Sequence, residues 1–193
     1  MHFALGRSGK AAMFGLACWL LPLGSVWAQS PPSNLGALKG EMKVIEAVID
    51  GTMAQTFAPP FGLLETTKGT YLPGFGLAFS LEVNLYPMRS PNPFNVTPLS
   101  QAELDKAHKV SLERIATIKE SVPRLLADHA RSLRDLSSGD SVAVVVHLFE
   151  VPADDIKFPD QLVIEAKKSD LDQFWDKKIS YRELTARMTI LEL

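Results

Sequence analysis

The segment GTYLPGFGLAFSLEVNLYPM, residues 69–88, decides the fold class. Large apolar side chains occupy every second position: Phe75, Leu77, Phe79, Leu81, Val83 and Leu85. Small or polar residues alternate with them: Gly76, Ala78, Ser80, Glu82 and Asn84. Period-two alternation with aromatic residues is typical of a β-strand with one buried face. The segment carries almost no reactive side chain, so its regularity indicates an architectural role.

Helical patterns lie on both sides of this strand. Residues 34–57 place apolar residues at steps of three and four, which predicts an amphipathic helix with Leu35, Leu38, Met42, Ile45, Ile49 and Met53 on its buried face. Ser100 and Glu103 form a capping box, which predicts a long helix over about 100–136. Pro123 is expected to kink or split that helix. The small residues Gly76, Ala78 and Ser80 would allow a helix to approach the strand closely.

Turn signals around the opening segment predict a hairpin. Residues 63–67 have the composition of a short strand, and Lys68–Gly69 is interpreted as the turn that follows it. Pro73–Gly74 interrupts the pattern and is interpreted as a bulge, because proline cannot donate a ladder hydrogen bond.

The C-terminal half alternates between strands and short helices. Strands are expected at 141–151, which is apolar on both faces and therefore central, at 161–168 and at 188–193. Ser169 with Asp172, and Ser180 with Glu183, are expected to cap two short helices. We therefore predict an α+β or α/β fold. It has one mixed sheet of about five strands with helices mainly on one face, in a single domain over 35–193.

Residues 1–28 are typical of a secretory signal peptide. Arg7 and Lys10 precede an apolar run that ends in Val26-Trp27-Ala28. Small residues at the −3 and −1 positions predict cleavage between Ala28 and Gln29, followed by a linker over 29–34. The alternative is an uncleaved leader that tethers a structural protein to the membrane, although the apolar run is shorter than the ~20 residues of a typical span.

Charge and cysteine content limit the functions of the exported domain. Cys18, the one cysteine, lies in the leader, so the domain has no disulfide and no thiol nucleophile. Removing Arg7 and Lys10 from the 20 basic residues leaves 18 against 22 acidic ones. This mild acidity argues against nucleic-acid binding, which normally needs a basic patch.

Side chains that could carry chemistry are scattered. His108 and His129 lie too far apart on one predicted helix to share a metal, and His147 lies between apolar strand residues. Acidic residues cluster at Glu150, Asp154, Asp155 and Asp160, and again at Asp170, Asp172 and Asp176. The second cluster lacks the glycine of a calcium loop, and acids at a helix start favour the helix dipole. We assign no catalytic residue, no metal and no cofactor.

The order strand–helix–strand over 74–151 predicts where a binding site would form. A long crossover normally joins parallel strands, and parallel strands end at the same edge of a sheet. The loops 87–99 and 152–160 should therefore emerge together, where ligands tend to bind. They carry the candidate ligand- or partner-binding residues Arg89, Asn92, Asn95, Asp154, Asp155 and Asp160.

The segment YLPGFGLAFSLEV, with the strand–helix–helix–strand order that ends the chain, resembles exported bacterial proteins of unassigned function. This resemblance implies no activity. The leading hypothesis is an exported, non-catalytic domain, periplasmic or secreted, that binds an unknown protein or small ligand in the bacterial cell envelope. The alternatives are a small hydrolase or metal-dependent enzyme that uses acidic residues of the 150–160 loop, and the membrane-tethered structural protein.

The leader generates the first testable prediction. The exported form should begin at Gln29, because Val26 and Ala28 fit the small-residue positions of a cleavage site. N-terminal sequencing of the exported fraction measures this directly. An N-terminus still at Met1 would contradict cleavage and favour the membrane tether.

Overall fold

A computed structural model describes residues 34–87, 100–149 and 158–193. The predicted leader and its cleavage site at Ala28 and Gln29 lie outside the described residues, as do Arg89, Asn92, Asn95, Asp154 and Asp155. The elements in chain order are α1 (Leu35–Thr56), β1 (Gly62–Leu72), β2 (Gly76–Asn84), α2 (Gln101–His129), a 3-10 turn η1 (Ala130–Ser132), β3 (Ser141–Phe149), β4 (Gln161–Lys167), α3 (Lys168–Trp175), α4 (Tyr181–Arg187) and β5 (Thr189–Glu192).

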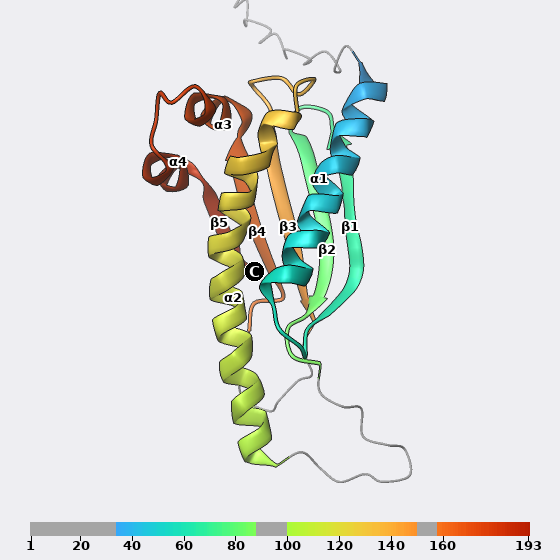
Figure 1. Ribbon diagram of the computed structural model, residues 1–193, viewed down its shortest axis with the longest axis vertical. Helices are drawn as coiled ribbons and strands as arrows, with labels where there is room; N and C mark the ends of the chain where they lie inside the picture. The colour runs from blue at the N-terminus through green and yellow to red at the C-terminus, as the bar shows by residue number, and fades with distance from the viewer. Residues whose placement is uncertain (1–33, 88–99, 150–157) are drawn as a thin grey trace, which may run out of the picture.

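The five strands form one mixed sheet in the order β1-β2-β3-β4-β5 (Figure 1). β2 and β3 are parallel, whereas the other neighbouring pairs are antiparallel. The long helix α2 provides the crossover between β2 and β3, as parallel strands require. The predicted α+β fold with a single mixed sheet of five strands is therefore confirmed.

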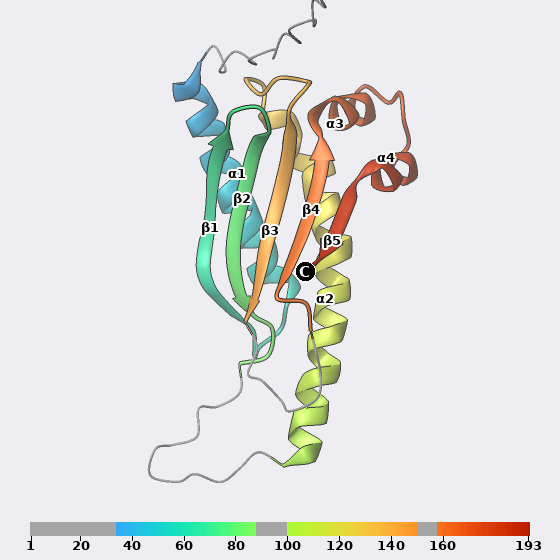
Figure 2. The same ribbon diagram turned by 180° about the vertical axis from the view of Figure 1, so that it is seen from behind.

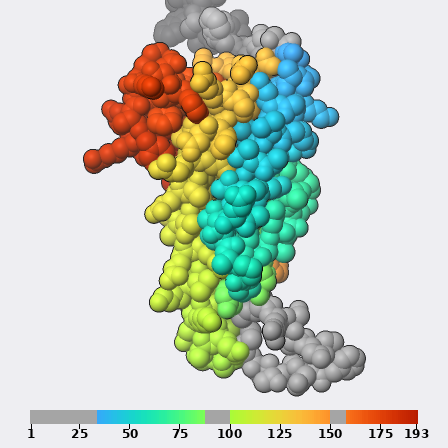
Figure 3. Space-filling model, in the orientation of Figure 1, coloured from blue at the N-terminus to red at the C-terminus, as the bar shows by residue number. Residues whose placement is uncertain are grey.

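The helices form a layer on one face of the sheet. Figures 1 and 3 show α1 and α2 lying side by side over this face. Figure 2 shows the opposite face, which no described helix covers. The short helices α3 and α4 lie beyond the ends of β4 and β5. The expectation that helices lie mainly on one face is confirmed.

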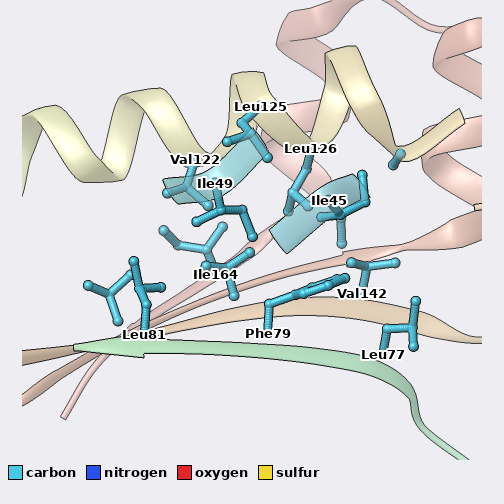
Figure 4. Close-up of a cluster of buried hydrophobic side chains, with 14 of the residues drawn as sticks. Ile45, Ile49, Leu77, Phe79, Leu81, Val122, Leu125, Leu126, Val142 and Ile164 are labelled. Carbon is cyan, nitrogen blue, oxygen red and sulfur yellow. The ribbon is translucent and has the colours of Figure 1, made fainter. Parts of the chain in front are cut away.

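The hydrophobic core lies between this helical layer and the sheet. The alternation in β2 directs Leu77, Phe79 and Leu81 into the core, where each is at most 1% exposed. Figure 4 shows these side chains meeting residues of the two helices, among them Ile45, Ile49, Val122, Leu125 and Leu126. Of the predicted face of α1, Leu38, Met42, Ile45, Ile49 and Met53 are buried, but Leu35 is 54% exposed because it begins the first turn.

The hairpin turn differs from the prediction. β1 continues through Lys68 and Gly69 to Leu72, so these residues are not the turn, and Pro73–Gly74 is not a bulge. The chain reverses at Pro73–Gly74, where the Phe75 N–H donates to the Leu72 carbonyl at 3.0 Å and Gly74 has a φ of 82°. Proline followed by glycine at positive φ is the signature of a type II turn, so the sequence does carry a local signal for this turn.

Glycine is also required immediately after the turn. Gly76 has a φ of 124°, and a Cβ atom there would lie 2.2 Å from the Ser141 carbonyl oxygen. Gly76 pairs with Ser141 at the start of the parallel ladder. The backbones approach so closely at the start of this ladder that only glycine, which has no side chain, fits at position 76.

The predicted long helix and two capping boxes are confirmed, and two details are corrected. α2 runs through Pro123 to His129 without a break, so Pro123 does not split it, and the 3-10 turn η1 continues it to Ser132. α3 begins at Lys168 with no side-chain cap, so Ser169 is not its cap. The capping boxes of Ser100 with Glu103 and of Ser180 with Glu183 are both present.

The small residues of β2 do not receive a helix. Ala78 and Ser80 point to the face that no described helix covers, because α1 and α2 pack against the large residues instead. The expectation of close helix packing at Gly76, Ala78 and Ser80 is therefore wrong. The strand alternates as predicted, but the helices lie on the other side.

The layering predicts a large loss of stability at one position of β2 and a small change at the position next to it. Phe79→Ala should lower the free energy of unfolding by ~3–5 kcal/mol, through lost transfer energy and a cavity under α1. Ala78→Leu should change it by less than ~1 kcal/mol, because the added side chain extends over the uncovered face. Denaturant unfolding measures both. A strong loss of stability in Ala78→Leu would indicate that something covers this face.

Candidate functional site

The predicted loop site requires that β2 and β3 end at the same edge of the sheet, and they do. β2 and β3 are parallel, and Asn84 at the end of β2 is paired with Phe149 at the end of β3. Of the six candidate binding residues, only Asp160 lies among the described residues. Its carbonyl accepts from the Leu148 N–H at 2.9 Å, and its N–H donates to the Leu193 carbonyl at 2.6 Å. The geometric part of the prediction is confirmed, and the site itself stays a prediction.

An arginine clamp lies at this same edge, on α2. The Arg114 guanidinium donates to three backbone carbonyls, those of Ala58, Pro60 and Leu85. Three aromatic rings surround it at 5.8–6.0 Å from their centroids, those of Phe57, Phe61 and Tyr86. Burial lowers the pKa of Arg114, while the nearby Tyr86 acts in the opposite direction.

This clamp is structural. It joins α2 to the connection between α1 and β1 and to the end of β2, since its three acceptors belong to those segments. Carbonyl oxygens occupy guanidinium donors that a ligand would need. Sequence reasoning missed Arg114, because its acceptors are backbone groups of segments distant in the chain.

The uncovered face of the sheet carries an apolar row. The strand register places Val145, Val163 and Leu191 side by side on β3, β4 and β5. Phe149 and Leu193 belong to the same face and are 48% and 63% exposed, and Leu191 is 46% exposed. We call Val145, Val163 and Leu191 the apolar row, and Phe149 and Leu193 its margin. Leu72, which pairs with Gly76 at the β1 edge, is a further exposed apolar side chain of this face, at 43%.

Polar side chains flank the apolar row. His147 Nε2 lies 3.1 Å from Ser80 Oγ. Glu65 and Lys68 form an ion pair at 2.7 Å, and the hydrogen bond and charge of Lys68 lower the pKa of the Glu65 carboxyl. Glu82 on β2 is another acid of this face.

Two of the acids on this face lack a basic partner within the described residues. Glu82 is paired in register with His147, and Glu165 on β4 lies between Ala143 and Thr189. Neither makes a salt bridge to a described lysine, arginine or histidine. Glu82 and Glu165 therefore present negative charge on opposite sides of the apolar row.

The described residues contain no cluster of three metal-ligating side chains. His108 contacts Phe158, with ring centroids 4.5 Å apart. The acids of the second predicted cluster all form ion pairs: Asp170 with Arg187, Asp172 with Lys168, and Asp176 with Lys178. These pairs account for the second cluster without a cation.

A groove of about 300 Å³ lies between the start of α1 and the end of β1. The residues that line it include the apolar Leu35, Leu38 and Met42, together with Tyr71, Lys39 and Lys43. One of its polar groups is already engaged, since Lys43 pairs with Glu46 at 2.5 Å. We therefore regard the uncovered sheet face as the stronger candidate site.

Comparison with protein-family models, with curated proteins and with solved structures finds no match for this chain. Among the described helices, none is both long enough and apolar enough to cross a membrane. The case for function therefore rests on the sheet face and its neighbouring groups.

The clamp generates a stability prediction with a matched control on the same helix. Arg114→Met should lower the free energy of unfolding by roughly 2–3 kcal/mol, because charged hydrogen bonds to three carbonyls are lost. Arg124→Met should lower the free energy of unfolding by less than ~1 kcal/mol. Arg124 lies over the Tyr181 ring at 4.9 Å, and a cation–π contact contributes less than three charged hydrogen bonds. Thermal and urea unfolding measure both variants. Equal losses would show that the carbonyl contacts of Arg114 add no stability.

Proposed function

We propose that this chain is an exported, non-catalytic domain that binds another protein through the uncovered face of its sheet. The observation that carries the proposal is the apolar row of Val145, Val163 and Leu191, which continues across three strands on a face without a described helix. Leu191 is exposed, and Val145 and Val163 are half-buried. Accessible apolar side chains that gather on one face and have a polar rim are typical of protein interaction sites.

The charges around the row specify the chemistry of the partner. Glu82 and Glu165 lie on its two sides and have no described basic partner. A bound segment would neutralise them best with lysine or arginine residues flanking its own apolar side chains, because complementary charges favour association. The proposed partner is therefore an amphipathic, basic segment of another protein.

Export supports a cell-envelope location for this interaction. Residues 1–28 have the basic start, apolar run and small-residue ending of a secretory leader. A domain without cysteine after cleavage folds without disulfides, so it relies on the core beneath α1 and α2. The partner would then be a protein met in the periplasm or outside the cell.

A peptide selection tests the proposal with defined probes. Random peptides displayed on phage are selected on the domain that begins at Gln29, and the enriched sequences are made as synthetic peptides. They should combine apolar residues with lysine or arginine, as the row and its acids require. Val163→Lys and the double variant Glu82→Gln/Glu165→Gln should each weaken peptide binding by about tenfold or more, measured by calorimetry.

The control for charge alone is the double variant Glu113→Gln/Glu120→Gln, on the exposed side of α2. It removes the same charge at a distance from the sheet face and should bind as the parent does. Each variant is first shown to melt as a folded protein. If no peptide is enriched, or if the α2 control weakens binding as much as the sheet-face variants, the proposal is wrong.

A further inference from the structure

The two outer edges of the sheet differ in a way that the partner-binding proposal does not require. At the β1 edge, α1 supplies acceptors for strand donors. The Thr67 N–H donates to Asp50 Oδ1 at 2.8 Å, and the Gly69 N–H donates to Glu46 Oε1 at 2.8 Å. β1 also contains two register shifts. Such features prevent a further strand from pairing at an edge.

The β5 edge is a short strand of four residues, and it lacks both of these features. β5 is the last strand in the sheet, and all four of its residues are exposed. It contains no proline and no register shift against β4. Within the described parts of the chain, no segment pairs with its outer side.

The hydrogen-bond phase of β5 defines which groups point outward. Leu193 and Gln161 exchange two backbone hydrogen bonds, at 3.0 and 3.1 Å. Bonded and non-bonded pairs alternate along an antiparallel ladder, so Leu191 and Thr189 also bond to β4. The N–H and C=O groups of Ile190 and Glu192 therefore point away from the sheet, which leaves two donors and two acceptors at this edge.

We propose that β5 pairs with β5 of a second copy of this chain, antiparallel and about a two-fold axis at Leu191. In this register Ile190 of each copy lies opposite Glu192 of the other. The two outward donors and two outward acceptors of each copy then form four hydrogen bonds across the axis. The two sheets join into one sheet of ten strands.

The side chains fit the same register. Leu191 lies opposite Leu191 of the second copy in a non-hydrogen-bonded pair, where side chains approach closely. The apolar row then continues from Val145 and Val163 through both leucines into the row of the second copy. Glu192 is held by Lys119 at 2.5 Å and lies opposite Ile190, so no like charges face each other.

Disulfide crosslinking tests the register. Leu191→Cys and Thr189→Cys are made separately in a chain in which Cys18→Ser removes the native thiol. Both positions lie on the same face of β5 and are exposed. Cβ atoms of a directly opposed pair lie about 4.5–5.5 Å apart, close to disulfide distance, so Leu191→Cys should form a covalent dimer under mild oxidation. Thr189→Cys should not, because Thr189 lies opposite Leu193 of the second copy.

A second pair of variants tests the backbone contacts. The parent domain should have twice the monomer mass at high concentration in analytical ultracentrifugation. Ile190→Pro removes one outward donor per copy and leaves the bonds to β4, so it should weaken association by about tenfold or more. Ile190→Ala keeps the donor and should associate more tightly than Ile190→Pro.

The outcomes separate this proposal from the one before it. A monomer at all concentrations, equal crosslinking at positions 189 and 191, or equal association of the two Ile190 variants would each overturn β5 pairing. None of these results concerns peptide binding to the sheet face. Conversely, failure to select a peptide would leave the mass and the crosslinks as evidence for the dimer.

Discussion

Two carboxylates on α1 join the helical layer to the sheet. β1 is an edge strand, so some of its N–H groups have no strand partner, and α1 lies close enough for Asp50 and Glu46 to accept from Thr67 and Gly69. Asp50 also accepts from the Thr67 hydroxyl at 2.6 Å. A buried donor without an acceptor is costly, so these bonds fix where α1 lies along β1. The same contacts close that edge of the sheet.

Much of the fold could be predicted from local sequence signals. The alternation through Leu77, Phe79 and Leu81 defined the buried strand, and the capping boxes at Ser100 and Ser180 defined two helix starts. These signals work because each depends on residues a few positions apart. The hairpin turn lies at Pro73–Gly74, which carries a valid turn signal, and not at the predicted Lys68–Gly69.

Other features could not be predicted because they depend on segments that meet only in the folded chain. Arg114 binds carbonyls from two distant segments, and carbonyls are present at every residue, so no sequence pattern marks the clamp. The alternation in β2 separates small from large residues, but the small residues do not identify the face that packs against the helices. The large residues of β2 determined this, because burial of Phe79 and its neighbours outweighs the closer approach that Ala78 would allow.

The uncovered face changes character from one edge of the sheet to the other. Along a single line of the register it passes from Lys68 and Ser80 to Val145, Val163 and Leu191. The charged end coincides with the edge that α1 closes, and the apolar end coincides with the open edge at β5. Apolar surface and free backbone groups both favour association. Because both are present at the β5 edge, the two edges of the sheet should differ in their tendency to associate. This arrangement supports the two proposals that place contacts with protein on the β5 side of the uncovered face.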